Sequence, residues 1–457
     1  MSHLLGSSLT SNSQHLTPKF RLLCLSNGHG EDIIAVRILQ ELQQHATPLK
    51  IAALPLVGEG QAYTQLGIPL IGPVQTMPSG GFVYMDGRQL VRDLRGGLLQ
   101  LTLAQLKAVR GWVSSQVPED GGGVILAVGD IVPLLFAWLS GATYAFVGTA
   151  KSEYYLRDEA GPYQRRSWMQ RWEGWSGSVY HPWERWLMSR PSCKAVFPRD
   201  SLTTQTLQKW SIPAFDLGNP MMDRLLYPPQ LSASNVEIRE QVLRHAPQPS
   251  LTIILLPGSR LPEAYANWQQ LQVAVASLCE SFHSSLLFLG AIAPGLSLET
   301  FRQSLVKADF QAVRSDDSGE HSSPISDLNA LTFKHKNASV ILTQHAYNEC
   351  LQLADLAIAM AGTATEQFVG LGKPAIAIPG SGPQFTAAFA EAQSRHLGPS
   401  LILVEQAHQV AQAVQDLLSE PDRLQLIAEN GVRRMGKPGA ARRIATCLME
   451  RLEQSCS

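Results

Sequence analysis

The chain has 457 residues, of which 45% are hydrophobic and 16% are charged, a composition typical of a soluble globular protein with two or three domains. Its formal net charge of −1 provides no global field that would recruit nucleic acid. No apolar run approaches the roughly 20 residues of a membrane-spanning helix, and the six cysteines are scattered without a C-x-x-C pair, as in reduced cytoplasmic proteins.

The first 18 residues are rich in serine and threonine and contain no acidic residue, lysine or arginine. A transit peptide would carry arginines and a secretion signal would carry an apolar core. We therefore expect a disordered tail before the first folded element.

The first folded element is a strand that runs into a glycine loop. Phe20–Ser26 is a short apolar run typical of a buried parallel strand, and helical spacing resumes at Ile34. Between them lies the loop Asn27-Gly28-His29-Gly30-Glu31-Asp32. Doubly wound domains place ligands at such a first βα turn. The spacing is not G-x-G-x-x-G, so it does not indicate a dinucleotide fingerprint.

A second strand of this half also ends in candidate site residues. Val124–Val128 is followed by Gly129-Asp130 and by a helix expected over Pro133–Leu139. Asp130 is thus expected at the carboxyl edge of the sheet, where ligands bind, although an N-cap for the helix explains it almost equally well. The remaining expected strands of this half are Lys50–Leu56, Tyr144–Gly148, Lys194–Pro198 and Phe215–Leu217. A long helix is expected over Leu90–Val113, and the glycine-rich segment Gly72–Gly87 is expected to form a flap or an acceptor-side loop.

A tryptophan-rich window follows Gly148. Five of the nine tryptophans lie in it, interleaved with arginines: Trp168, Trp172, Trp175, Trp183 and Trp186. Tryptophan and arginine together suit a membrane interface, where the ring lies among headgroups and the cation meets anionic lipid. A packed helical segment with snorkelling arginines is the alternative.

The second half opens with another strand and glycine turn. Leu251–Leu256 is an apolar run that ends in Pro257-Gly258-Ser259-Arg260. The forked donors of Arg260 could reach a phosphate, and a structural salt bridge is the competing role. The hydrophilic stretch 314–336 is expected to form a surface loop before a strand at Ser339–Leu342.

The stretch Leu356–Gly370, LAIAMAGTATEQFVG, predicts a strand, a tight turn and the start of a helix. Thr363 and Thr365 could cap the helix, and Gly362 would let the backbone approach a ligand closely, so this corner should bind an anion. Glu366 would lie beside that anion, where its carboxylate could accept hydrogen bonds from neutral hydroxyls such as those of a ribose. An ordinary βα corner with a solvated glutamate is the alternative.

These motifs together resemble the lipid-A-disaccharide synthase family of glycosyltransferases, and more narrowly its synthase-related branch. The resemblance covers most of the chain and implies an α/β protein of the glycosyltransferase B-type fold, with two facing doubly wound Rossmann-like domains. After G-T-A-T the family usually has Leu then Glu, whereas this chain has Glu366 then Gln367. Either residue could therefore occupy the position that hydrogen-bonds the ribose hydroxyls. The motifs that carry the resemblance are the loop 27–32, Val57-Gly58 to Gly67, Gly129-Asp130, Gly218-Asn219-Pro220-Met221-Met222-Asp223, Pro257-Gly258-Ser259-Arg260 and Gly362-Thr363-Ala364-Thr365-Glu366.

The resemblance implies an inverting hexosyltransferase that moves a sugar from a UDP-sugar, of the UDP-N-acetylglucosamine type, to a lipid or other membrane-associated hydroxyl. The strand pattern and composition predict a tail (1–18), a first domain (19–226), a linker (227–250), a second domain (251–430) and C-terminal helices (431–457) expected to pack back on the first domain. With the resemblance, the first is expected to be the acceptor-side domain and the second the nucleotide-sugar-binding domain. The expected donor-binding residues are Ser259, Arg260, Gly362, Thr363, Ala364, Glu366 and Gln367, and the expected acceptor-side residues are Asn27, Gly28, Gly30 and Asp32.

Asp130 is the candidate general base, and His29 is its rival because imidazole titrates nearer neutrality. No D-x-D motif occurs, so we expect no metal and no cofactor beyond the donor itself. Trp168, Trp172 and Trp175 would make the peripheral membrane contact of a cytoplasmic protein. Two other functions stay open, a UDP-sugar 2-epimerase-like isomerase and a non-catalytic nucleotide-sugar-binding protein.

Overall fold

The computed structural model describes residues 20–45, 49–75, 98–115, 123–164, 174–225, 251–313 and 324–456. These residues fall into two units. The N-terminal unit comprises the chain up to Phe146, Arg190–Lys194 and the chain from Ala445 on, and the second unit comprises Val147–Ser189 and Ala195–Ile444. In the described residues no helix combines the length and apolar character that crossing a bilayer requires.

One sheet has five strands in the order β2-β1-β3-β4-β7. Strand β1 pairs in parallel with both β2 and β3. All seven residues of β1 are buried, which explains the unbroken apolar run in its sequence, because a central parallel strand is covered on both faces. The bounds of these strands are β1 Phe20–Ser26, β2 Leu49–Pro55, β3 Gly123–Gly129, β4 Thr143–Gly148 and β7 Cys193–Phe197.

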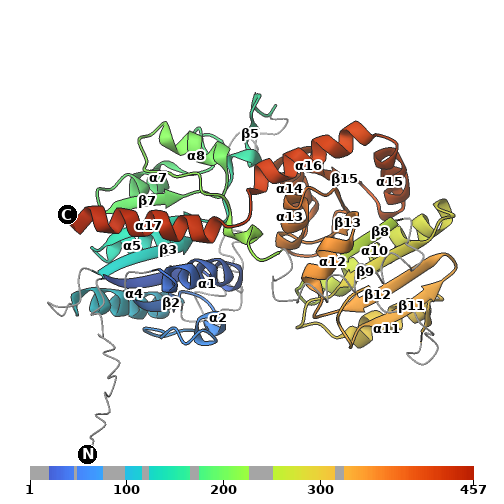
Figure 1. Cartoon of the computed structure of the whole chain (residues 1–457), viewed down its shortest axis with the longest axis horizontal. Helices are drawn as coiled ribbons and strands as arrows, with labels where there is room; N and C mark the ends of the chain where they lie inside the picture. Colours follow the sequence, from blue (N-terminus) through green and yellow to red (C-terminus); the bar gives the residue numbers. More distant parts are fainter. Residues whose placement is uncertain are drawn as a thin grey trace, which may run out of the picture. The chain divides into compact units, whose positions relative to one another are not determined.

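The second sheet has eight strands in the order β10-β11-β12-β9-β8-β13-β14-β15 (Figure 1). From β12 to β15 every neighbouring pair is parallel, whereas β10, β11 and β12 pair antiparallel. The strands are β8 Leu251–Leu256, β9 Leu286–Ala291, β10 Gln311–Ala312, β11 Leu331–His335, β12 Ala338–Thr343, β13 Leu356–Ala359, β14 Ala375–Ala377 and β15 Leu401–Leu403.

Strand order locates the ligand-binding edge of each sheet. In the second sheet the parallel strands lie side by side in the order β12-β9-β8-β13-β14-β15. Chain order runs outward in one direction from β8 to β12 and in the other direction from β13 to β15, so it reverses between β8 and β13. In the five-stranded sheet it reverses between β1 and β3. Open α/β sheets bind ligands outside the carboxyl ends of the strands at this switch point. Both sheets therefore confirm the doubly wound α/β class.

Helices connect these strands, as the alternating pattern predicts. In the first part of the chain they are α1 His29–Gln43, α2 Gln61–Thr64, α4 Leu98–Ser114, α5 Ile131–Leu139, η1 Glu153–Tyr155, α7 Pro182–Met188, α8 Ser201–Gln208 and η2 Pro220–Met222, with a short hairpin of β5 Arg157–Asp158 and β6 Gly161–Pro162. In the rest they are α10 Glu263–Ser281, α11 Leu298–Lys307, α12 Tyr347–Leu353, α13 Thr363–Gly370, α14 Ala387–Leu397, η4 Gly398–Ser400, η5 Ala407–Gln409, α15 Val410–Leu418, α16 Pro421–Met435 and α17 Ala440–Cys456.

Two expected elements are wrong. Phe215–Leu217 is no strand, because pairing there is limited to an isolated bridge between Val196 and Ala214. The hydrophilic stretch 314–336 contains strand β11, in which Phe333 is buried and Lys334 is exposed. Because the residues on its exposed face are polar, the alternation of buried and exposed residues along β11 was not recognised as a strand pattern.

Two other expected elements are described only in part. The helix expected from Leu90 is described from Leu98 on, as α4. The glycine-rich loop Gly72–Gly87 lies outside the described residues beyond residue 75.

Candidate functional site

The carboxyl ends of β8 and β13 bring two predicted ligand turns side by side. The strands are parallel neighbours with Leu256 opposite Ala359, so the turn that starts at Pro257 lies beside the turn that starts at Met360. Gly258 has a φ of +91°, and a Cβ atom there would lie 3.3 Å from the carbonyl oxygen of Met360. The turns therefore approach each other closely, and glycine meets both the steric and the backbone requirement.

Asn267 of helix α10 ties these two turns together. Its Nδ2 atom donates to the carbonyl oxygens of Pro257 at 3.0 Å and Met360 at 3.4 Å. The side chain is 3% exposed. One buried amide thus holds both backbones in place.

Glu263, one turn earlier on α10, holds a third loop, which follows β14. Its Oε1 atom accepts a hydrogen bond from the Phe385 amide at 2.7 Å, and a Cβ atom at Gly382 would lie 2.4 Å from the same carboxylate. Because residues i and i+4 share a helix face, Glu263 and Asn267 organise the loops after all three strands. Sequence reasoning missed both residues, although a polar i, i+4 pair directly after the P-G-S-R turn is a readable signal.

The first turn of α13 lacks a side-chain cap within the part of the chain that the structure describes. Gly362 is the N-cap residue, and no described side chain accepts from the first-turn amides. The expectation that Thr363 and Thr365 cap this helix is wrong, because the Thr365 hydroxyl donates to the Ala361 carbonyl at 2.6 Å and Thr363 is exposed. Uncapped amides at the positive end of a helix dipole suit an anion.

Five of the predicted donor residues are brought together at these turns. Gly362, Thr363 and Ala364 lie on the α13 corner, and the neighbouring turn carries Ser259, which is exposed, and Arg260, which is partly buried. The geometry offers backbone amides, a hydroxyl and a guanidinium within two adjacent turns. This set of donors can bind a phosphate or diphosphate.

Glu366 and Gln367 are buried and face protein partners. Glu366 Oε2 lies 2.7 Å from Nη2 of Arg199, in an ion pair with both side chains buried. The Gln367 amide accepts from the Tyr347 hydroxyl at 2.8 Å and donates to the Met221 carbonyl at 3.0 Å. Both ends of the Gln367 amide are therefore engaged.

His396 lies beside this ion pair with its ring fully buried. Its Nε2 atom is 3.7 Å from Oε1 of Glu366, and its ring stacks on Tyr155 at 4.7 Å between centroids. Neither ring nitrogen has a hydrogen-bond partner among the described residues. Burial, with the charges of Arg199 and Arg434, holds the pKa of His396 well below its usual value, so the ring is neutral.

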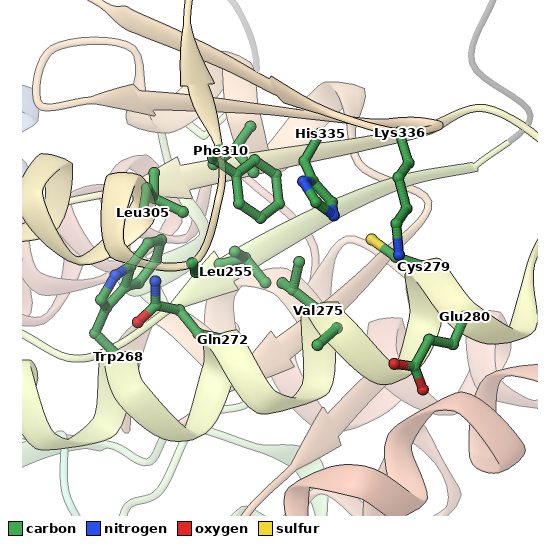
Figure 2. Close-up of a pocket in the computed structure, with 13 residues that line it drawn as sticks. Leu255, Trp268, Gln272, Val275, Cys279, Glu280, Leu305, Phe310, His335 and Lys336 are labelled. Carbon is green, nitrogen blue, oxygen red and sulfur yellow. The ribbon is translucent and has the colours of Figure 1, made fainter.

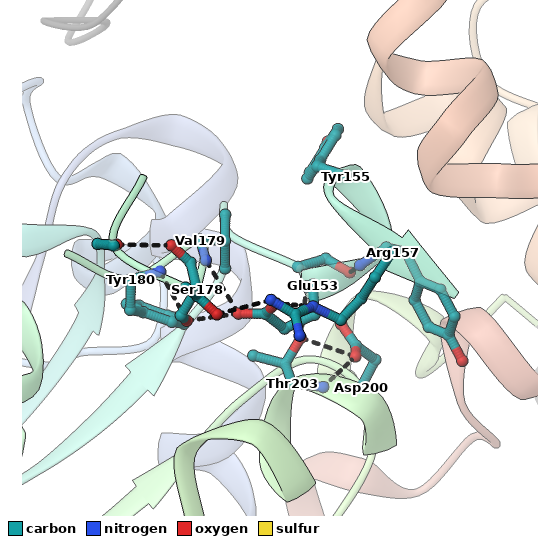
Figure 3. Close-up of polar contacts among 12 residues, drawn as sticks. Glu153, Tyr155, Arg157, Ser178, Val179, Tyr180, Asp200 and Thr203 are labelled. Carbon is teal, nitrogen blue, oxygen red and sulfur yellow. Dashed lines mark hydrogen bonds and ion pairs between the residues drawn. The ribbon is translucent and has the colours of Figure 1, made fainter. Parts of the chain in front are cut away.

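A buried polar network fixes the segment that carries Arg199 (Figure 3). Asp200 caps helix α8 by accepting from the amide and hydroxyl of Thr203 at 2.8 and 2.7 Å. Glu153 accepts from Ser178 and from the Val179 amide at 2.9 Å, and its own amide donates to Thr203. Burial raises the pKa of Asp200. Arg199 is the residue before this cap, so the network fixes its backbone.

At the switch point of the five-stranded sheet, Asn27 contacts Asp130. Asn27 Nδ2 donates to Asp130 Oδ2 at 2.9 Å, while Asp130 Oδ1 accepts from the Val132 amide at 2.8 Å and so caps α5. The structure thus brings together two predicted site residues and shows the N-cap arrangement for Asp130. Gly28 has a φ of +136°, a backbone conformation that side chains rarely adopt.

The other residues of the first glycine loop differ in their exposure. Asp32 is 4% exposed, and its carboxylate accepts from the Ser26 hydroxyl at 2.5 Å. Ser26 in turn accepts from Tyr63, so this carboxylate belongs to a buried network. Gly30 is exposed, whereas the His29 side chain lies outside the described residues.

The motif Gly218 to Asp223 has a structural role that the sequence did not reveal. The Asp223 carboxylate accepts from the amides of Gly439 at 2.5 Å, Ala440 at 3.0 Å and Ala441 at 2.7 Å. These amides lead into α17, so Asp223 caps that helix.

The tryptophan-rich window presents several exposed rings. Trp175 is 54% and Trp183 51% exposed, and the His181 ring lies 6.3 Å from the first and 4.7 Å from the second. The Arg185 guanidinium lies 3.9 Å over the ring of Trp210. Trp168 and Trp172 lie outside the described residues.

A cavity of about 130 Å³ is lined along one side by residues of helix α10 (Figure 2). Trp268 and Gln272 lie toward one end, and Cys279, Glu280 and Lys336 toward the other. Leu255, Val275, Leu305 and Phe310 give the lining apolar surface, and the His335 ring also borders the cavity. None of the predicted donor or acceptor residues lines it.

Comparison with known proteins defines the fold. Neither a protein-family model nor a curated protein matches the chain. Solved structures match almost throughout: UDP-GlcNAc 2-epimerase from Neisseria meningitidis bound to UDP-GlcNAc (TM-score 0.51, 14% identity, 94% of this chain and 100% of that one), Acinetobacter baumannii MurG (0.51, 13%, 95% and 100%) and the glycosyltransferase of kitacinnamycin (0.52, 15%, 96% and 100%). The chain therefore has the two-domain fold of the glycosyltransferase B type.

Proposed function

We propose that the chain is an enzyme that binds a UDP-sugar, with the diphosphate at the turns after β8 and β13. The observation that carries this proposal is the pairing of the P-G-S-R turn with the uncapped start of α13 at the switch point of the second sheet. The amides of Gly362 to Ala364, the hydroxyl of Ser259 and the guanidinium of Arg260 would neutralise the diphosphate. One of the similar structures was solved with UDP-GlcNAc bound, which supports this choice of ligand.

The proposed reaction is transfer of the sugar to an acceptor hydroxyl with inversion. The acceptor oxygen attacks the anomeric carbon, the bond from that carbon to the diphosphate oxygen breaks, and UDP leaves with the electron pair. Fixed donors at the leaving diphosphate lower the barrier because they need no reorganisation. The acceptor proton passes to a general base, for which Asp130 is the candidate and His29 the rival.

For the acceptor we propose a lipid or another membrane-associated molecule. The support is the exposed pair Trp175 and Trp183, with Trp186 a further exposed ring at 45%. Tryptophan side chains lie favourably at the level of lipid headgroups. Trp168 and Trp172 would extend this contact.

A 2-epimerase is the second candidate, because the UDP-GlcNAc 2-epimerase matches the fold about as well as the glycosyltransferase of kitacinnamycin does. An epimerase converts one UDP-sugar into another without any acceptor, so its product still carries the bond between the sugar and the diphosphate. A transferase releases UDP and needs an acceptor. The two candidates therefore differ in their products.

Proton NMR of the reaction distinguishes them. UDP-N-acetylglucosamine or UDP-glucose would be incubated with the protein, with and without a detergent extract of membrane lipids and with EDTA present, because we expect no metal requirement. UDP release that depends on the extract and is lost in Arg260→Ala supports transfer, and a new UDP-sugar epimer formed without extract supports the isomerase. Binding of UDP without either product would leave a non-catalytic binding protein.

A further inference from the structure

Arg199 and Glu366 form a buried ion pair that links two distant parts of the sequence. Arg199 is 4% and Glu366 7% exposed. Arg199 donates through Nη2 to Glu366 Oε2 at 2.7 Å and through Nη1 to the Thr149 carbonyl at 3.1 Å. A buried guanidinium is always charged and needs an anionic partner, so the pair fixes the side chain of Glu366.

The two oxygens of Glu366 differ in their surroundings. Oε2 is held by Arg199, whereas Oε1 accepts no hydrogen bond from the described residues and lies 3.7 Å from Nε2 of the neutral His396. A ligand hydroxyl would therefore compete with no protein donor for Oε1. By contrast, both ends of the Gln367 amide are already bonded within the protein.

We propose that Arg199 is a positioning residue of the donor site. By holding Oε2, it leaves Oε1 of Glu366 to accept a ribose hydroxyl of the nucleotide bound at the start of α13. This inference rests on the proposed function, because it requires a nucleotide at that helix. Arg199 itself contacts no substrate in this proposal.

The test compares the binding of UDP with that of 2′,3′-dideoxy-UDP, which lacks the ribose hydroxyls. A hydrogen bond to a charged group contributes about 1.5–3 kcal/mol, so the wild type should bind UDP roughly 10- to 100-fold more tightly than the dideoxy nucleotide. Glu366→Gln and Arg199→Gln should each reduce this ratio to within about 3-fold. The affinity for the dideoxy nucleotide should stay near that of the wild type.

Three further variants separate positioning from folding. Arg395→Gln removes a neighbouring arginine that contacts the Tyr155 carbonyl but not Glu366, and it should keep the wild-type ratio. Arg199→Lys keeps the positive charge but lacks the planar guanidinium with its paired donors. It should lower the ratio of UDP affinity to dideoxy-UDP affinity, and it serves as the test if Arg199→Gln does not fold. The double change R199Q with E366Q removes both buried charges, so it should recover thermal stability while the ratio stays low.

The possible outcomes are distinct. A wild type that binds both nucleotides equally, or arginine variants that keep the wild-type ratio, would overturn the positioning role. Equal weakening of both nucleotides by Arg199→Gln and Arg199→Lys would also overturn it, since it would show only a structural role. A wild type that binds no uridine nucleotide contradicts the proposed function itself.

Discussion

Asn27 and Asp130 are 103 positions apart in the chain, yet the Asn27 amide donates to the Asp130 carboxylate at 2.9 Å. They meet because they follow β1 and β3, which are neighbours on either side of the switch point. The carboxylate also caps α5 through the Val132 amide. The candidate base is therefore also the residue that caps α5.

Substitution of Asp130 by Asn separates these two roles. Asparagine caps a helix about as well as aspartate, but its NH2 group cannot accept from Asn27, so we expect the free energy of unfolding to fall by only about 1–3 kcal/mol. It cannot accept the acceptor proton, so turnover should fall about 100- to 10,000-fold. Urea unfolding and initial rates of UDP release measure the two effects. If Asp130→Asn retained wild-type turnover, Asp130 would have only the capping role, and His29 would become the candidate general base.

Asn267→Leu tests the link between the two donor turns. The change leaves the carbonyls of Pro257 and Met360 without their buried donor, so we expect a loss of about 1–3 kcal/mol in the free energy of unfolding. UDP affinity should fall as well, because the turns would no longer be fixed. Gln272→Leu is the matched control, since it lies on the same helix and its Nε2 atom has no partner among the described residues. Equal UDP affinity in both variants would contradict the link.

His396 should make the protein sensitive to acid. Its pKa in the folded protein is well below 6.5, so the unfolded chain binds the proton first, and stability is fully present above about pH 6.5 and falls below it. The maximum slope is about 1.4 kcal/mol per pH unit, so His396→Phe should reduce the loss between pH 6.5 and 5 by up to about 2 kcal/mol. Urea unfolding across this range, with the exposed His408→Gln as control, measures it. Parallel curves for wild type and His396→Phe would refute the assignment.

The membrane contact is tested by cosedimentation with anionic liposomes. Replacing both Trp175 and Trp183 by alanine removes two rings that are more than half exposed, so bound protein should decrease several-fold. Leu328, which is fully exposed elsewhere, provides the control as Leu328→Ala. Unchanged binding by the double variant would remove these two residues from the proposed contact.

Short-range patterns predicted the fold well. Buried parallel strands are continuous apolar runs, as in Phe20–Ser26 and Leu251–Leu256, and glycine turns follow them. Strand β11 was not predicted from the sequence, because its exposed face is polar and only Phe333 is fully buried. Local propensity therefore identified the central strands and failed at the edge of the sheet.

The partners within the candidate site could not be predicted in the same way. The sequence identified Glu366, but its partner Arg199 is 167 positions away, and nothing local to either residue indicates the other. The i, i+4 spacing of Glu263 and Asn267 can be read in the sequence, but the backbone groups of the turns that they bind cannot. Such contacts follow from the order of strands in the sheet rather than from a motif.

Calorimetric titration with UDP, GDP and ADP is the most direct test of the proposed donor site. The wild type should bind UDP in preference to the purine nucleotides, and Arg260→Ala should weaken UDP binding by about 10-fold or more through loss of a charged hydrogen bond to the diphosphate. Failure of the wild type to bind UDP, or undiminished binding by Arg260→Ala, would contradict a diphosphate site at the turns after β8 and β13.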